Sequence, residues 1–221
     1  MTYYKVLDEN NQGIFSRADW FLPKGRRPGK WMPKVVGKLF ICNTGYHLCR
    51  ESDLAQWLGP NIYEIESKSE VVEVTGHTNK VLTAGPVRLV SKLDTWNDKS
   101  ARLFAADCAE HVLYLFEDRY PQDERPRKAI KAARQFISGD ITFDEMAAAW
   151  DAAWDAARAT AGDAARAAAG AAAGYAAWAA AKATAWAAAG AAAGDAAWAA
   201  ARAAERQWQT ERLVEYLNGK R

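Results

Sequence analysis

The sequence predicts an α+β protein, in which a small and mainly antiparallel N-terminal sheet domain precedes an α-helical region of tightly packed Ala/Gly-rich repeat helices. Three changes in composition along the 221 residues support this prediction. Residues 1–95 contain short runs of Val, Ile and Tyr bounded by turn formers, and residues 96–146 have the apolar periodicity of amphipathic helices. Residues 147–221 begin with a stretch that is about two-thirds alanine. We therefore expect three segments with these boundaries.

The N-terminal segment is expected to form several strands around one short helix. Residues 3–7 are typical of a strand and stop at a strong turn signal in residues 10–13. A Pro- and Gly-rich loop then runs to Pro33. Further strands are predicted where β-branched residues cluster, over residues 35–42, 62–66, 70–75 and 86–93. The short helix is expected over residues 51–58, ahead of a Gly-Pro pair.

The middle segment predicts two amphipathic helices. Ser100 can cap the first helix, whose apolar stripe includes Leu115 and which ends before Pro121. Pro126 suits the first turn of the second helix, and Gly139 suits its end.

The alanine-rich segment repeats every four residues. Thr142 and Glu145 form a capping-box pattern ahead of it, and from Trp150 onward the residues other than alanine recur at every fourth position. An unbroken helix over residues 150–206 would be ~84 Å long, whereas a compact chain of this length has a radius of gyration of only ~17 Å. We therefore expect breaks that fold the segment into shorter packed helices, with an extended rod as the alternative. The expected breaks are at Gly162 and in residues 170–174 and 190–194.

Composition and missing motifs narrow the class of protein. With 29 basic and 27 acidic residues, the net charge of +2 fits neither a polycation nor an acidic disordered tail. The sequence shows no long apolar run and no basic-then-apolar signal region, and it has only three cysteines, so we expect a cytoplasmic protein in a reducing environment that does not cross a membrane. The common phosphate-loop, dinucleotide, zinc-protease and nucleophile-elbow motifs are missing. Their absence does not exclude an enzyme, but it removes the common routes to naming one, and we expect no cofactor.

Two groups of cationic and aromatic residues are candidate binding sites. The Pro- and Gly-rich loop places cations beside tryptophans, a pattern that can contact a phosphate backbone and stack bases. The alanine-rich segment combines Trp with Arg or Lys in the same way. The candidate binding residues are Trp20, Lys24, Arg26, Arg27, Lys30, Trp31, Arg166, Trp178, Lys182, Trp186, Trp198 and Arg202. The alternative interpretation is structural, with a solvated loop and with tryptophans that anchor a packed helical core.

A cysteine- and histidine-containing segment is the weakest candidate. Cys42, His47 and Cys49 offer two thiolates and an imidazole within eight residues. Zinc needs four such ligands, and the fourth would have to come from a distant part of the chain. We therefore favour buried cysteines beside a turn over a metal site. An enzyme built around Tyr46, His47 and the strand carboxylates is a further alternative.

Two parts of the chain resemble known families. The motifs D-C-A-E-x-V-L at residues 107–113 and D-E-R-P-R-K-A-I at residues 123–130, followed by the alanine-rich repeats, resemble the alanine-rich putative immunity proteins of bacterial polymorphic-toxin systems over residues ~100–215. The segment L-F-I-C-N-T-G-Y-H-L-C at residues 39–49, with its C-x-x-G-Y-H-L-C motif, resembles an uncharacterised small domain of phage and bacterial genomes.

The resemblances imply a non-enzymatic phage or mobile-element accessory protein that binds and neutralises another macromolecule, as an immunity or anti-defence protein does. The expected partner is a bacterial protein whose identity the sequence does not specify, and neither family supplies a catalytic residue. The alternative is a nucleotide- or nucleic-acid-binding and sequestering module that uses the basic loop and the tail tryptophans. The Ala/Gly helix faces would also allow a homo-oligomer.

Overall fold

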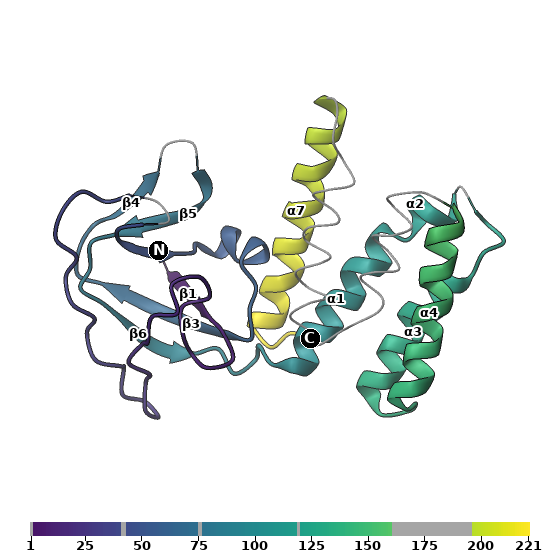
Figure 1. Ribbon diagram of the computed structural model, residues 1–221, viewed down its shortest axis with the longest axis horizontal. Helices are drawn as coiled ribbons and strands as arrows, with labels where there is room; N and C mark the ends of the chain where they lie inside the picture. The colour runs from purple at the N-terminus through teal and green to yellow at the C-terminus, as the bar shows by residue number, and fades with distance from the viewer. Residues whose placement is uncertain (1, 41–42, 75–76, 119, 161–195) are drawn as a thin grey trace. The chain divides into compact units, whose positions relative to one another are not determined.

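The computed structural model describes the backbone of residues 2–40, 43–74, 77–118, 120–160 and 196–221 (Figure 1). Within these ranges it describes every side chain except those of residues 74, 77–79, 154–160 and 196–202. The chain divides into two compact units. The first contains Met1–Asn97 with Leu217–Gly219, and the second contains Asp98–Tyr216 with Lys220–Arg221.

The first unit contains two antiparallel sheets of three strands each. One sheet has the strand order β1-β3-β6, formed by Tyr3–Leu7, Asn61–Ser67 and Val87–Lys92. The other has the order β2-β5-β4, formed by Tyr46–Leu48, His77–Thr83 and Val71–Val74. The antiparallel pairing that the sequence predicts is confirmed.

One residue at the end of β2 links the two sheets. Tyr4 of β1 and Cys49 exchange two backbone hydrogen bonds, with the Tyr4 N–H donating to the Cys49 carbonyl over 2.8 Å and the Cys49 N–H donating back over 2.9 Å. Side chains from both sheets form one apolar core. Its buried members are Leu7, Trp20, Leu48, Tyr63, Ile65, Val81, Val87 and Leu89.

The Pro- and Gly-rich loop follows the outer edge of β6. The backbone N–H groups of Gly29 and Met32 donate to the carbonyls of Leu89 and Val87, over 2.9 and 2.7 Å. Only glycine fits at position 29, because a Cβ there would lie 1.9 Å from the Phe21 carbonyl oxygen. The loop thereby satisfies an edge whose backbone groups would otherwise need another partner.

Two sequence-based predictions for this unit need correction, and one strand lacks a sequence signal. The strand expected over residues 35–42 does not form within residues 35–40, where Gly37 has a φ of 108° and Val36 is 91% exposed. Strand β5 was not predicted, because its first half, H-T-N-K, has little apolar character. The helix expected over residues 51–58 is a 3₁₀ helix, Glu51–Gln56, in which the Asp53 carboxylate accepts the Arg50 backbone N–H at 2.9 Å.

The second unit is helical. Its described helices are α1 (Asp98–Val112), α2 (Tyr114–Glu117), α3 (Arg125–Ser138), α4 (Phe143–Thr160) and α7 (Ala196–Leu217). In Figure 1, α3 and α4 lie side by side, and they join α1 and α2 around a buried apolar cluster. The members of this cluster are Ala109, Leu113, Phe116, Ala129, Ile130 and Ala153. The predicted α+β architecture, antiparallel sheets followed by helices, is confirmed.

Most helix ends lie where the sequence predicts them. Pro126 occupies the first turn of α3, and Gly139 ends that helix with a φ of 84°. The predicted cap of the first helix is wrong, because α1 begins at Asp98 and leaves Ser100 buried inside it. Leu115 is also not buried, since a turn at Leu113 separates α1 from α2 and changes which side chains face the core.

The expected repeat-helix breaks lie in residues 161–195, outside the described ranges, and so do the close helix packing and any homo-oligomer contact predicted from those residues. Among the helices that the structure does describe, none is long and apolar enough to span a membrane.

The start of α4 offers a test of the capping box. The Thr142 N–H and hydroxyl both donate to Glu145 Oε2, over 2.8 and 2.9 Å, and the Glu145 N–H donates to Thr142 Oγ1 over 3.3 Å. We expect Thr142→Ala to lower the free energy of unfolding by about 1 kcal/mol, because the Glu145 N–H loses its acceptor, Thr142 Oγ1. Thr142→Ser keeps the hydroxyl and is the control. Equal stability of the two variants in urea, followed by far-UV circular dichroism, would contradict a capping role.

Candidate functional site

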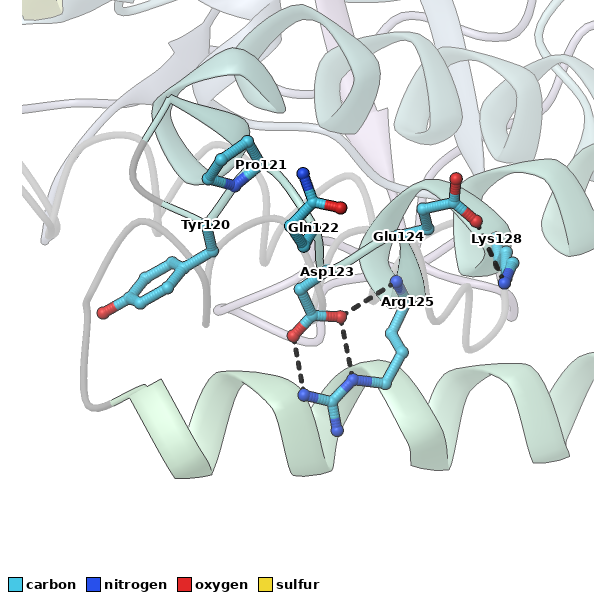
Figure 2. Close-up of a pocket in the computed structure, with 7 residues that line it drawn as sticks. All are labelled: Tyr120, Pro121, Gln122, Asp123, Glu124, Arg125 and Lys128. Atoms are coloured by element: carbon cyan, nitrogen blue, oxygen red, sulfur yellow. Dashed lines mark hydrogen bonds and ion pairs between the residues drawn. The ribbon is translucent and has the colours of Figure 1, made fainter.

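The D-E-R-P-R-K segment lines a surface cavity of about 560 Å³ at the start of α3 (Figure 2). Its charged side chains pair with one another. Asp123 accepts two hydrogen bonds from the Arg125 guanidinium, over 2.8 and 2.6 Å, and Lys128 lies 3.1 Å from Glu124. The Arg125 hydrogen bonds lower the pKa of the Asp123 carboxyl. Because these described charges compensate each other, the cavity is a poor site for an ionic ligand.

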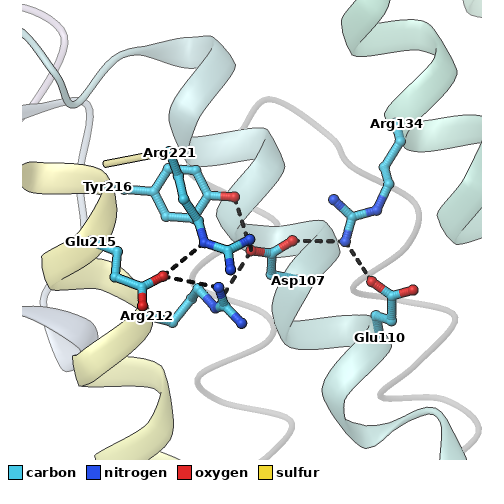
Figure 3. Close-up of polar contacts among 7 residues, drawn as sticks. All are labelled: Asp107, Glu110, Arg134, Arg212, Glu215, Tyr216 and Arg221. Atoms are coloured by element: carbon cyan, nitrogen blue, oxygen red, sulfur yellow. Dashed lines mark hydrogen bonds and ion pairs between the residues drawn. The ribbon is translucent and has the colours of Figure 1, made fainter. Parts of the chain in front are cut away.

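The D-C-A-E motif supplies a buried carboxylate that joins three helices (Figure 3). Asp107 of α1 is 7% exposed. It accepts hydrogen bonds from Arg134 of α3 over 2.7 Å and from the Tyr216 hydroxyl of α7 over 2.9 Å. The guanidinium groups of Arg212 and Arg221 lie within 3.6 and 3.8 Å of the same carboxylate. A buried charge with these partners is compensated, so the motif holds the helices together.

Two acidic side chains extend this cluster toward solvent. Glu110, the last residue of the motif, accepts a 2.6 Å hydrogen bond from Arg134, and Glu215 pairs with both Arg212 and Arg221. Burial together with the Asp107 carboxylate raises the pKa of the Tyr216 phenol, so its hydroxyl stays protonated and donates. The cluster is therefore a closed set of ion pairs with a structural role.

A second contact between α1 and α7 involves His111. Its imidazole stacks on the Trp208 ring, with centroids 3.8 Å apart and planes 2° from parallel, and its Nε2 lies 3.2 Å from the Glu205 carboxylate. Burial raises the pKa of Glu205. Cys108, in the next turn back, is buried, and burial raises the pKa of its thiol well above the usual value. These features favour a structural role over a reactive one.

The basic loop exposes its cations to solvent, whereas Trp20 is buried and Trp31 is half-buried. Lys24, Arg26, Arg27 and Lys30 are all exposed. Trp20 is only 9% exposed, in the core of the first unit. The Trp31 ring carries the Lys68 ammonium and the Arg88 guanidinium, each 4.4 Å from its centroid. The binding role predicted for this loop stays a prediction, and base stacking would need Trp31 to exchange its present cationic neighbours for a base.

The predicted tail residues are not brought together in the described part of the structure. Trp198 and Arg202 belong to α7, but their side chains are outside the description. The other four predicted tail residues lie outside the described ranges altogether. They are Arg166, Trp178, Lys182 and Trp186.

A cavity of about 570 Å³ in the first unit brings His47 and Cys49 together with two lysines that the sequence did not group with them. His47 and Cys49 line it, together with Lys5 of β1 and Lys80 of β5. Burial lowers the pKa of the His47 imidazole from 6.5 to about 4, and both lysines add to this effect. Burial raises the pKa of the Cys49 thiol to about 12. A neutral imidazole and a protonated thiol are a poor nucleophilic pair at neutral pH.

The described geometry of the cysteine- and histidine-containing segment therefore favours neither metal binding nor nucleophilic catalysis. Cys42 lies outside the described residues, and the described part of the chain contains no group of three or more His, Cys, Asp or Glu side chains placed to hold a metal ion. Lys5 and Lys80 are cavity residues that sequence reasoning missed. The only signal for Lys5 is a cation in the middle of the apolar run Y-Y-K-V-L. Lys80 lies in the polar first half of β5.

Comparison with known proteins assigns a family to the chain through the helical second unit. Residues 91–216 match the model of a family described as Imm-5 like putative immunity protein. Because this range covers more than half of the 221 residues, the chain belongs to that family. No curated protein and no solved structure matches the chain. The match includes Asp107, Arg134, Arg212 and Tyr216, so most of the buried carboxylate cluster lies inside the family region, and Arg221 lies beyond it.

The carboxylate cluster makes a prediction about stability. Asp107→Asn removes the negative charge that compensates Arg134 and Arg212, and we expect the free energy of unfolding to fall by about 2–4 kcal/mol. Glu110→Gln is the matched control, because its 54% exposed carboxylate also pairs with Arg134 and should contribute less than ~1 kcal/mol. Urea unfolding measures both. A smaller loss in Asp107→Asn than in Glu110→Gln would refute the central role of Asp107.

The low pKa of His47 predicts how stability depends on pH. Between pH 6.5 and about 4, an unfolded chain binds a proton at His47 that the folded protein does not. The contribution of neutral His47 to folding is therefore present above pH 6.5 and is lost as the pH falls toward 4. We expect His47→Gln to show a shallower loss of stability than the wild type in this window, measured by urea unfolding at a series of pH values. Parallel pH profiles of the two proteins would show that folding does not lower the pKa of the His47 imidazole.

Proposed function

We propose that this protein is an immunity protein, which binds a toxic bacterial protein and neutralises it. The observation that carries the proposal is the family match over residues 91–216, which includes the described helices α1–α4 and nearly all of α7. We include in the proposal the phage or mobile-element origin and the anti-defence role that the sequence resemblance implies. Neutralisation by binding needs a surface but no catalytic residue, which agrees with the structural roles of Asp107 and His111.

We assign the toxin-binding surface to α2. Tyr114 and Leu115 are 56% and 47% exposed, although both are large and partly apolar. Their neighbours Leu113 and Phe116 are 2% and 1% exposed and belong to the core cluster. The two exposed side chains are therefore held on a short helix that is anchored on both sides, so binding would order little additional chain. Tyrosine is enriched among the residues that dominate binding energy.

The partner that fits such a surface is a folded toxin domain with an apolar recess. A tyrosine in a desolvated recess buries its ring and keeps its hydroxyl available for a hydrogen bond. The proposal is therefore specific to protein binding at α2 and does not depend on the basic loop of the first unit.

Growth rescue tests the proposed function. The full-length protein is co-expressed in a bacterial host with each toxin domain encoded beside genes of this family, and survival is scored. We expect one toxin to be neutralised, and we expect Tyr114→Ala to weaken binding of that toxin roughly 30-fold in calorimetry, as about 2 kcal/mol implies for a dominant contact. Leu115→Asp should abolish rescue, since it introduces a charge into the buried contact.

Val36→Asp is the matched control. Val36 is an exposed apolar residue of the first unit, 91% accessible, and its replacement should leave both rescue and affinity unchanged. If no toxin domain is neutralised, the immunity role is wrong. If a toxin is neutralised equally well by Leu115→Asp and Val36→Asp, the role stands but its assignment to α2 is wrong.

A further inference from the structure

The cavity of the first unit has the size of a small-molecule site. Its volume of about 570 Å³ lies within the range of roughly 300–1,000 Å³ that is typical of ligand pockets. Its walls come from β1, β2 and β5, from the turn around residues 13–20, and from Trp57 at the end of the 3₁₀ helix. Residues far apart in the sequence thus enclose one space, within a single unit of the structure.

The charged side chains that line this cavity are cationic. Lys5 and Lys80 both line it, whereas none of the described lining residues is Asp or Glu. Both lysines are therefore cations within the same cavity. The Lys5 ammonium also donates a 3.1 Å hydrogen bond to the His47 carbonyl, which fixes its position. Two cations in one cavity favour an anion and repel a metal ion.

Phe15, Trp20, Tyr46 and Trp57 give the lining an aromatic part. Trp20 meets Tyr46 edge to face with centroids 5.7 Å apart, and Trp57 meets Phe15 in the same way at 5.9 Å. The Tyr46 hydroxyl donates to the Pro33 carbonyl over 2.8 Å, so it is the ring of Tyr46 that remains as a wall. Lys5 lies 5.2 Å from the Trp20 centroid and Lys80 lies 4.7 Å from that of Trp57. Each cation is therefore adjacent to an indole.

We propose that this cavity binds a small aromatic anion, with its planar ring against the indole and phenol walls and its phosphate or carboxylate group held by Lys5 and Lys80. Cations beside aromatic faces match both halves of such a ligand. The proposal goes beyond neutralisation of a toxin, because the cavity lies in the first unit and the toxin-binding surface is assigned to the second. The basic loop contributes uncharged residues such as Trp20 and Met32 to the cavity, whereas its exposed cations do not line it.

Isothermal titration calorimetry of the full-length protein tests the proposal. The probes are adenosine 5′-monophosphate and indole-3-acetate, which carry a phosphate and a carboxylate, with adenosine and inorganic phosphate as comparisons. We expect at least one of the two aromatic anions to bind at one site, and adenosine and phosphate each to bind at least about tenfold more weakly, because each lacks one half of the ligand. The stronger of the two anions identifies the anionic group that the site prefers.

Two lysine variants provide a matched comparison. Lys80 and Lys68 each lie over an indole, those of Trp57 and Trp31, but only Lys80 lines the cavity. We expect Lys80→Gln to weaken binding of the preferred anion by at least about tenfold and Lys68→Gln to change it less than about twofold. Lys5→Gln should act as Lys80→Gln does, and if it fails to fold, Lys80→Gln decides the question.

Several results would overturn the proposal. An aromatic-anion site in this cavity would be excluded if neither anion binds or if adenosine binds as tightly as its monophosphate. It would also be excluded if Lys80→Gln and Lys68→Gln have equal effects on binding. Loss of binding in Arg27→Gln but not in Lys80→Gln would move the site to the basic loop. None of these measurements includes a toxin, so they fail or succeed independently of the growth-rescue test.

Discussion

The buried carboxylate of Asp107 is the constraint on which the helical unit depends. A carboxylate that is 7% exposed destabilises a fold unless its charge and lone pairs are compensated, and here the compensation comes from two other helices. Arg134 of α3 and Tyr216 of α7 must therefore occupy defined positions against α1. The alanine-rich composition makes this constraint more important, because alanine side chains bury little apolar area and specify helix position weakly.

In the first unit the arrangement of the sheets depends on the three-residue strand β2 and on Cys49, the residue that follows it. The backbone hydrogen bonds between Cys49 and Tyr4 link the two sheets, and the pairing of β2 with β5 extends the surface on the other side. Lys5 and Lys80 thereby line the same cavity. The cationic cavity is a consequence of how the sheets are joined, and the exposed cations of the basic loop do not contribute to it.

The two units support two different kinds of recognition. The family region presents Tyr114 and Leu115 on an anchored helix, which suits a protein partner. The first unit encloses a space of small-molecule size with cations and aromatic rings. Among the described side chains that are usual candidates for catalysis, Cys49 and Cys108 are buried, His47 lines the cavity as a neutral imidazole, and His111 stacks on Trp208.

The sequence by itself determined the features that depend on near neighbours. Thr142, Glu145, Pro126 and Gly139 mark helix ends because caps form between residues a few positions apart, and the apolar runs of β3 and β6 identify strands in the same way. Only the tertiary structure decided that Asp107 meets Tyr216, 109 positions later, and that Lys5 meets Lys80 around one cavity. No local pattern encodes these pairs, because each depends on how distant elements pack. For the same reason β5, with its polar first half, became a strand through its partners β2 and β4, while residues 35–40, despite their β-branched side chains, did not.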